Sequence, residues 1–112
     1  MATSRDGLIP GTLSLLILKS LSHGPMHGYA LSKWVQQQTG DLLQVAEGVL
    51  YPALHLLEHE GCLKAEWRRH DTGRRAKFYS LTERGRKRLQ EETARWRRSS
   101  RAVEMVLAPG RG

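Results

Sequence analysis

Gln44 to Gly61 read QVAEGVLYPALHLLEHEG, a stretch whose apolar residues recur with the period of an α-helix. A helix from about Ala46 to Glu60 places four residues on one core-facing stripe: Leu50, Ala53, Leu54 and Leu57. The opposite face has no aliphatic side chain and collects Gly48, Tyr51, Pro52, His55 and His59. Gly61 is a suitable left-handed stop for this helix. Such a pattern also fits an ordinary surface helix, so its meaning depends on the residues beyond Gly61.

After Gly61 the period changes from helical to alternating, which predicts a β-strand. Leu63, Ala65 and Trp67 alternate with charged residues, and a turn-rich segment comes next at residues 70–75. Residues 76–81 then predict the returning strand. A polar-faced helix followed by a hairpin that holds Arg74 and Arg75 is the winged helix-turn-helix arrangement. In it the helix enters the major groove of DNA and the hairpin contacts the backbone beside it.

The same segments resemble the signature of PadR-type transcriptional regulators. The resemblance rests on Gly48 to Leu54, Leu57 to Gly61, the upstream His27-Gly28-Tyr29, and the downstream run from Arg74 to Gly85. Together these matches span about Leu13 to Leu89. The resemblance implies a homodimeric winged helix-turn-helix protein that binds DNA, usually as a repressor and often relieved by a small molecule. Its pattern commonly has a capping residue where Ala46 stands and a basic residue where Leu56 stands.

Composition agrees with one small basic domain. The 112 residues hold 18 Lys and Arg against 11 Asp and Glu, a net charge of +7. Fifteen of the basic residues but only six acidic ones fall in residues 63–112. A basic half favours nucleic acid or an anionic surface as partner. No apolar run is long enough to span a bilayer, no secretory leader is visible, and a lone Cys62 excludes an intrachain disulfide, so we expect a cytoplasmic protein.

Four regions are expected along the chain. Residues 1–10 predict a flexible arm, 11–81 the winged helix-turn-helix domain, 82–107 a C-terminal dimerisation helix and 108–112 a disordered tail. The fold class is mainly α with a small β-hairpin. Within the domain we expect a first helix from about Thr12, as its cap, to Ser22, and a second from His27 to about Gln38. Residues 42–45 are a candidate third strand, and Trp34 and Trp67 are expected in the core.

The first and last helices predict a homodimer. The first helix is apolar nearly all round, so it needs cover from several sides. The last is about 38 Å long at 1.5 Å per residue, too long for the head to cover. Its stripe is only partly apolar and resembles that of a coiled coil. The expected interface residues are Leu13, Leu16, Ile17, Leu89, Thr93, Trp96, Val103 and Leu107.

The expected partner is double-stranded DNA carrying a pseudo-palindromic operator. The candidate contacts on the helix are Gln44, Glu47, Gly48, Tyr51, Pro52, His55 and His59, and those on the hairpin are Arg74, Arg75 and Lys77. Tyr51 either donates its hydroxyl to a phosphate or packs as an aromatic ring. Glu47 either accepts from a cytosine amino group or stabilises the positive end of the helix. Arginines at the tip of a hairpin beside a recognition helix favour phosphate contacts.

The resemblance points to Trp96 as an effector-binding residue, because drug-binding members of the family stack flat aromatic ligands on a tryptophan of the last helix. An ordinary interface aromatic is the alternative. A metal- or redox-responsive sensor is a second hypothesis, since His55, His59 and Cys62 have ligand-like spacing, but a closed zinc site needs four ligands. A nonspecific nucleic-acid-binding module is a third. No catalytic or cofactor-binding motif is present, so neither an enzyme nor a resident cofactor is expected.

Overall fold

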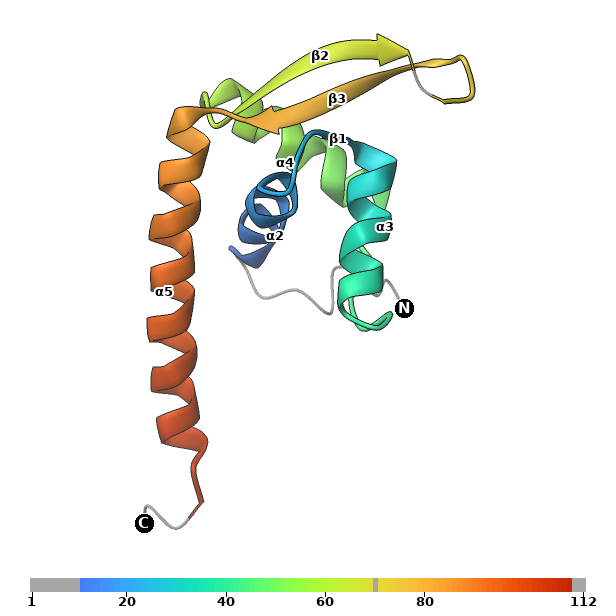
Figure 1. The fold of residues 1–112 in the computed structure, drawn as a ribbon. Coiled ribbons are helices and arrows are strands. Elements are labelled where there is room, and N and C mark those ends of the chain that lie inside the picture. The colour runs from blue at the N-terminus through green and yellow to red at the C-terminus, as the bar shows by residue number, and fades with distance from the viewer. Residues whose placement is uncertain (1–10, 70, 110–112) are drawn as a thin grey trace.

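The structure, a computed structural model, describes residues 11–69 and 71–109. The expected arm at residues 1–10 and the last three residues of the expected tail lie outside this part. The described elements run in the order α2 (Thr12–Leu21), β1 (Met26–His27), α3 (Gly28–Gln38), α4 (Glu47–His59), β2 (Leu63–Arg69), β3 (Arg75–Leu81) and α5 (Glu83–Leu107). Figure 1 shows α2, α3 and α4 gathered beneath the sheet while α5 runs away from them as a separate column.

The sheet has three antiparallel strands in the order β1-β3-β2. Strand β2 pairs with β3 from Leu63 opposite Leu81 to Arg69 opposite Arg75. The third strand is β1, in which Met26 pairs with Tyr79. The prediction of a third strand at residues 42–45 is therefore wrong. That segment bonds to α3 instead, where the Leu43 amide donates to Thr39 Oγ1 at 3.0 Å.

One core lies between the helices and the sheet. The stripe predicted for α4 is confirmed, because Leu50, Leu54 and Leu57 are 0–2% exposed. The buried apolar residues are Ile17, Leu18, Leu21, Leu31, Val35, Val45, Leu50, Leu54, Leu57, Cys62, Leu63, Tyr79 and Leu81. Trp34 packs against this core as expected. Ile17 is fully buried within its own chain, so its side chain has no surface left for a partner subunit.

The helix ends are set by local chemistry. Helix α3 starts one residue later than predicted because His27 is its cap, accepting from the Ala30 amide at its Nδ1 at 3.2 Å. Gly11 rather than Thr12 caps α2, and its φ of 91° suits a residue without Cβ. Thr82 caps α5 as predicted, accepting from the Gly85 amide at 3.0 Å. Gly61 ends α4 in the left-handed region, with φ of 82°.

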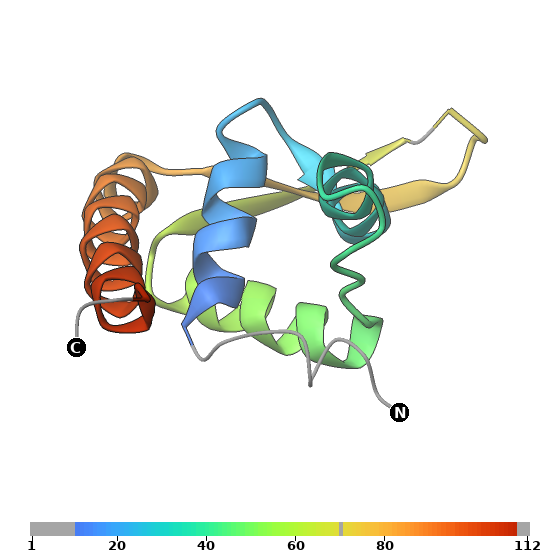
Figure 2. The same ribbon diagram turned by 90° about the horizontal axis from the view of Figure 1, so that it is seen from below.

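Helix α5 gives the molecule its elongated outline, with extents of 60 × 33 × 20 Å. Seen from below, α5 stands to one side of α2 and the hairpin extends past α3 on the other side (Figure 2). Only Gly85 of α5 is buried, and the helix is exposed along most of its length beyond the head. Over the described ranges, none of the helices combines the length and apolar character needed to cross a membrane.

Candidate nucleic-acid interface

The outward face of α4 is open to solvent and polar. Gly48, Pro52, His55 and His59 are all exposed, as is Glu47 in the first turn. Pro52 lies in the second turn and has no N–H, so the carbonyl of Gly48 lacks its usual helical partner. A Cβ added at Gly48 would meet nothing within 4 Å. This face therefore combines polar side chains with open space at Gly48, where another molecule can approach the helix backbone.

Gln44 is held outward by its neighbours in the turn that leads into α4. Val45 beside it is buried, and the Ser32 hydroxyl donates to the Val45 carbonyl at 3.2 Å. On the other side, Leu43 is fixed through its amide to Thr39. With both neighbours anchored, the exposed Gln44 side chain projects next to the N-terminus of α4.

The Tyr51 side chain is more constrained than its position on the predicted polar face of α4 suggests. Its ring lies on the buried Gly28 at the start of α3, where an added Cβ would stand 2.5 Å from the Tyr51 hydroxyl oxygen. Burial, followed by the charge of Glu47, raises the pKa of Tyr51. The ring is therefore a packing element that joins the two helices, and Tyr51 also lines a surface groove beside α4. The two interpretations of Tyr51 are compatible.

The wing, defined here as β2, β3 and the turn between them, carries exposed cations toward its tip. Arg74 and Arg75 are exposed, and the Arg75 guanidinium lies 5.8 Å from the centre of the Trp67 ring. Lys77 differs from them, because its Nζ is 3.6 Å from Glu58 Oε1 on α4. Its charge is thus partly neutralised, whereas no ion pair within the described residues involves Arg74 or Arg75.

The prediction of Trp67 as a core residue is wrong. The alternation placed it correctly on the side of the sheet that holds Leu63 and Ala65, but it is 59% exposed. The hairpin extends beyond the helices that would cover it (Figure 1). Trp67 instead lines a groove of about 510 Å³ with Tyr29, Tyr51 and His55. Tyr29 is also 59% exposed, and sequence reasoning did not single it out as a site residue.

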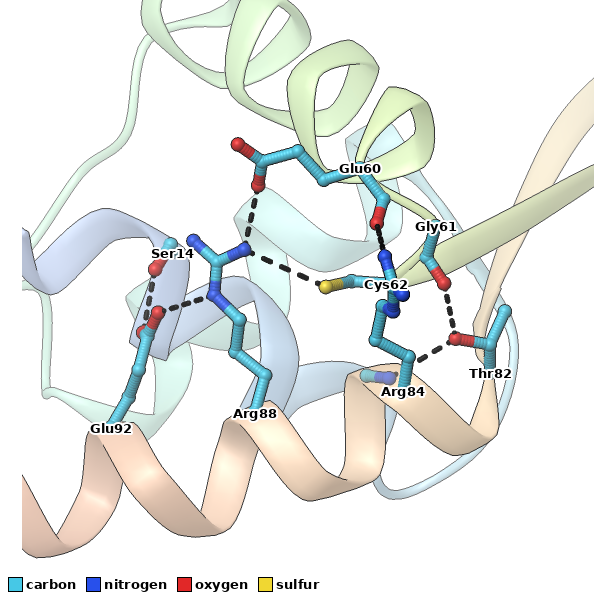
Figure 3. Close-up of polar contacts among 9 residues, drawn as sticks. Ser14, Glu60, Gly61, Cys62, Thr82, Arg84, Arg88 and Glu92 are labelled. Atoms are coloured by element: carbon cyan, nitrogen blue, oxygen red, sulfur yellow. Dashed lines mark hydrogen bonds and ion pairs between the residues drawn. The ribbon is translucent and has the colours of Figure 1, made fainter.

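The C-terminus of α4 is fastened to α5 through Arg88. Its guanidinium donates to Glu60 at 2.6 Å and to Glu92 at 2.8 Å, and Glu92 in turn accepts from Ser14 of α2 at 2.6 Å (Figure 3). Hydrogen bonds to Glu92 and Glu60 raise the pKa of Arg88. We call Ser14, Glu60, Arg88 and Glu92 the α4–α5 bridge. It ties the end of the outward-facing helix to the long helix and to α2.

A second set of bonds holds the first turn of α5. The Thr82 hydroxyl donates to the Gly61 carbonyl at 2.6 Å, and Arg84 donates to the Glu60 carbonyl at 3.0 Å (Figure 3). Gly85 packs so closely that an added Cβ would stand 2.1 Å from the Cys62 carbonyl oxygen. The direction of α5 relative to α4 is therefore fixed at several points.

Trp96 lies on α5 beyond the bridge and is 39% exposed. It lines a cavity of about 500 Å³ between α5 and the start of α2, together with Ser14, Arg88, Glu92 and Arg95. Val103 continues the Trp96 face of α5 and is 56% exposed. Of the other expected interface residues, Leu13, Leu16 and Leu89 are half-buried against their own core. Thr93 is half-buried and Leu107 is exposed.

The histidines and the cysteine of the sensor hypothesis do not form one site. His55 and His59 are exposed, whereas Cys62 is buried with its sulfur 3.6 Å from an Arg88 nitrogen. In residues 11–69 and 71–109, no three His, Cys, Asp or Glu side chains are grouped closely enough to hold a metal ion.

A helix-turn-helix pair, α3 and α4, followed by a two-stranded wing defines the class of winged-helix DNA-binding proteins. The PadR-like family of transcriptional regulators matches residues 17–91, and the chain belongs to this family. It is thus a transcriptional regulator and not an enzyme.

Several relatives share nearly the whole chain. A transcriptional regulator from Clostridium thermocellum is 26% identical with a TM-score of 0.81, covering 88% of this chain and 95% of that one. A PadR family regulator from Eggerthella lenta DSM 2243 is 31% identical with a TM-score of 0.77, covering 89% of this chain and 85% of that one. An uncharacterised protein from Lysinibacillus sphaericus is 24% identical over 92% of this chain and 94% of that protein.

Proposed function

We propose that the protein is a homodimeric repressor that binds a pseudo-palindromic operator and is released by a small aromatic effector. The observation that carries the proposal is the placement of the polar face of α4 beside the cationic wing. With α4 in the major groove, Gln44, Glu47 and His55 face base edges, while Arg74 and Arg75 face phosphates. Gly48 and Pro52 let the helix backbone approach the DNA closely.

The dimer is supported by α5. Its 25 residues continue well past the head, and Trp96, Val103 and Leu107 leave apolar surface exposed on one side. A second copy of the same helix is the natural cover for this stripe. The α4–α5 bridge then makes the separation of the two α4 helices depend on how the α5 helices pair. That separation has to match half-sites one helical turn apart, about 34–36 Å.

The effector site is proposed at the cavity beside Trp96. The indole offers a flat apolar surface, Arg95 offers donors, and the Ser14 hydroxyl, which donates to Glu92, offers an acceptor. The same cavity touches Arg88 and Glu92 of the α4–α5 bridge, so a ligand there is close to the contacts that orient α4.

Titrations on DNA test the proposal. The full chain is mixed with duplexes from the region upstream of its own gene and with scrambled duplexes of the same composition. We expect protection of a two-fold symmetric site and affinity for it at least about 1000-fold above that for scrambled DNA. Equal affinity for both duplexes would favour a nonspecific nucleic-acid-binding module. A change in affinity on adding chelator or oxidant would favour the metal or redox sensor.

The wing supplies a direct check of the DNA orientation. Arg74→Ala with Arg75→Ala removes two phosphate-facing charges, so binding to all duplexes should weaken alike. The slope of log K against log salt concentration should fall by about 0.9 for each phosphate that the variant no longer neutralises. An unchanged slope would place both arginines away from the DNA.

A further inference from the structure

The groove between α4 and the wing, here called the strand groove, is lined mainly by aromatic side chains. Tyr29 comes from α3, Tyr51 and His55 come from α4, and Trp67 comes from β2. Its volume is about 510 Å³, and its lining includes His55 of the polar face of α4. Tyr29 and Trp67 are each 59% exposed. Exposing two large rings beside one groove is unusual unless something covers them.

The proposed position of the DNA determines which part of the duplex lies over this groove. The major and minor grooves of a duplex are separated on each side by one sugar–phosphate strand. If α4 lies in the major groove and the wing lies at the neighbouring minor groove, that strand has to pass between them. The strand groove is the space between α4 and the wing, so the strand runs over it.

The surrounding charges suit such an occupant. Lys33 lies 5.8 Å from the centre of the Tyr29 ring, and Arg75 lies 5.8 Å from that of Trp67. Lys77 in the groove lining is paired with Glu58, and the charge of Glu47 acts on Tyr51 at the other side of the groove. The surface therefore offers two rings, each flanked by a cation, which fits a polyanion with an apolar sugar between its phosphates.

We propose that Tyr29 and Trp67 hold the strand between α4 and the wing by packing on its deoxyribose rings. This inference rests on the proposed function and adds contacts from α3 and β2 to it. This contribution to affinity does not depend on salt, because an uncharged ring that packs on a sugar releases no counterion. It acts on every sequence alike, because the sugar is the same in each nucleotide. Trp67 and Tyr29 are thus positioning residues that set where the strand lies relative to α4.

Fluorine NMR of the full chain tests the contact between Trp67 and the DNA strand. The protein is labelled with 5-fluorotryptophan, and the Trp67 resonance is assigned with Trp67→Phe. A mixed-sequence duplex of about two helical turns is then added at low salt. We expect the Trp67 resonance to shift and the Trp34 resonance to stay, because Trp34 packs against the core and does not line the groove. An unmoved Trp67 resonance on a duplex that does bind would overturn the inference.

Salt-dependent titrations separate ring packing from charge. Trp67→Ala and Tyr29→Ala should each lower affinity about five- to tenfold for any duplex and leave the salt slope unchanged. Trp67→Phe should recover part of the affinity. Arg74→Ala is the matched control, since it should lower the slope by about 0.9. A lower slope for Trp67→Ala would show that it acts only through Arg75 and would overturn the proposal.

The proposed function and the strand contact give different results when they fail. If the unaltered chain binds no duplex, the proposed function is wrong. If it binds while Trp67→Ala and Tyr29→Ala bind equally well, only the strand contact is wrong. Circular dichroism of each variant checks the fold, and both side chains are exposed enough for substitution without loss of the core.

Discussion

Two glycines near Tyr51 have opposite roles, and their surroundings tell them apart. Gly28 is buried directly under the Tyr51 ring, whereas Gly48 is exposed with nothing within 4 Å of an added Cβ. The helical period placed Gly48 on the outward face, but nothing in the sequence showed that Gly28 packs under Tyr51. The difference comes from tertiary packing across 23 positions between residues 28 and 51.

Gly48→Ala should raise stability and lower DNA affinity. Alanine favours the helix over glycine by about 0.5–1 kcal/mol, and the methyl group meets no atom of the chain. The same methyl would stand between α4 and the base edges. Urea unfolding and duplex titration measure the two effects. Greater stability with unchanged affinity for operator and scrambled DNA would put this face of α4 away from the DNA.

Gly28→Ala should lower stability, by about 1–3 kcal/mol, because the new methyl overlaps the Tyr51 ring. Removing the ring with Tyr51→Ala should relieve the overlap, so the double variant should be more stable than the sum of the single changes predicts. Urea unfolding of the three variants gives the coupling. Additive effects would show that Tyr51 can leave Gly28 without cost.

At the scale of elements, the sequence predicted the helices and the hairpin well but misplaced the third strand. Periodicity is a local signal, and it located α4, β2 and β3 within a residue or two. A two-residue strand such as β1 has no period to detect, and it forms only because Met26 and His27 lie beside β3. Trp67 shows the complementary limit, since alternation gives the face of a strand but not the length over which helices cover it.

The α4–α5 bridge predicts a graded effect at Arg88. Arg88→Met removes the guanidinium from Glu60 and Glu92, although Glu92 keeps its bond from Ser14. The free energy of unfolding should fall by about 1 kcal/mol, a modest value because the Arg88 side chain is 34% exposed. The free energy of unfolding of Arg88→Lys should lie between that of the unaltered chain and that of Arg88→Met, since one ammonium cannot reproduce the two-sided guanidinium contact. Chemical denaturation measures both.

Arg84→Ala is the control for the bridge. Arg84 donates to the Glu60 carbonyl from an exposed position, so its removal should cost less than that of Arg88. Equal destabilisation by the two substitutions would mean that the carboxylates at Arg88 contribute nothing beyond a backbone contact.

At the scale of the whole molecule, two tyrosines predict sensitivity to alkaline pH. Burial, ahead of the other causes, raises the pKa of Tyr51 and of Tyr79. A raised pKa means that the unfolded chain loses these protons first. The stabilisation is therefore complete below about pH 10 and is lost as pH rises through the folded pKa values. Tyr51→Phe should flatten the fall in unfolding free energy above that pH, measured by urea titration. An unchanged fall would assign the effect to other groups.

The shape of the molecule leads to the last prediction, which concerns α5. Val103 and Met105 are each 56% exposed near the free end of this helix. Their side chains point in different directions. An α-helix turns by about 100° per residue, so Met105 lies about 200° round the helix from Val103. Val103 continues the stripe of Trp96, seven positions earlier, whereas Met105 faces away from it. A dimer built on that stripe buries Val103 and leaves Met105 in solvent.

Val103→Lys should therefore weaken dimerisation at least about tenfold, and Met105→Lys, equally exposed and equally charged, should leave it unchanged. Sedimentation at micromolar concentration measures the association. Operator titration should show weaker DNA binding for Val103→Lys than for Met105→Lys, because a single head engages only one half-site. Neither residue touches the core, so circular dichroism of the head should stay the same. A monomeric full-length chain, or equal dissociation by both substitutions, would mean that α5 does not join two copies through the Trp96 face.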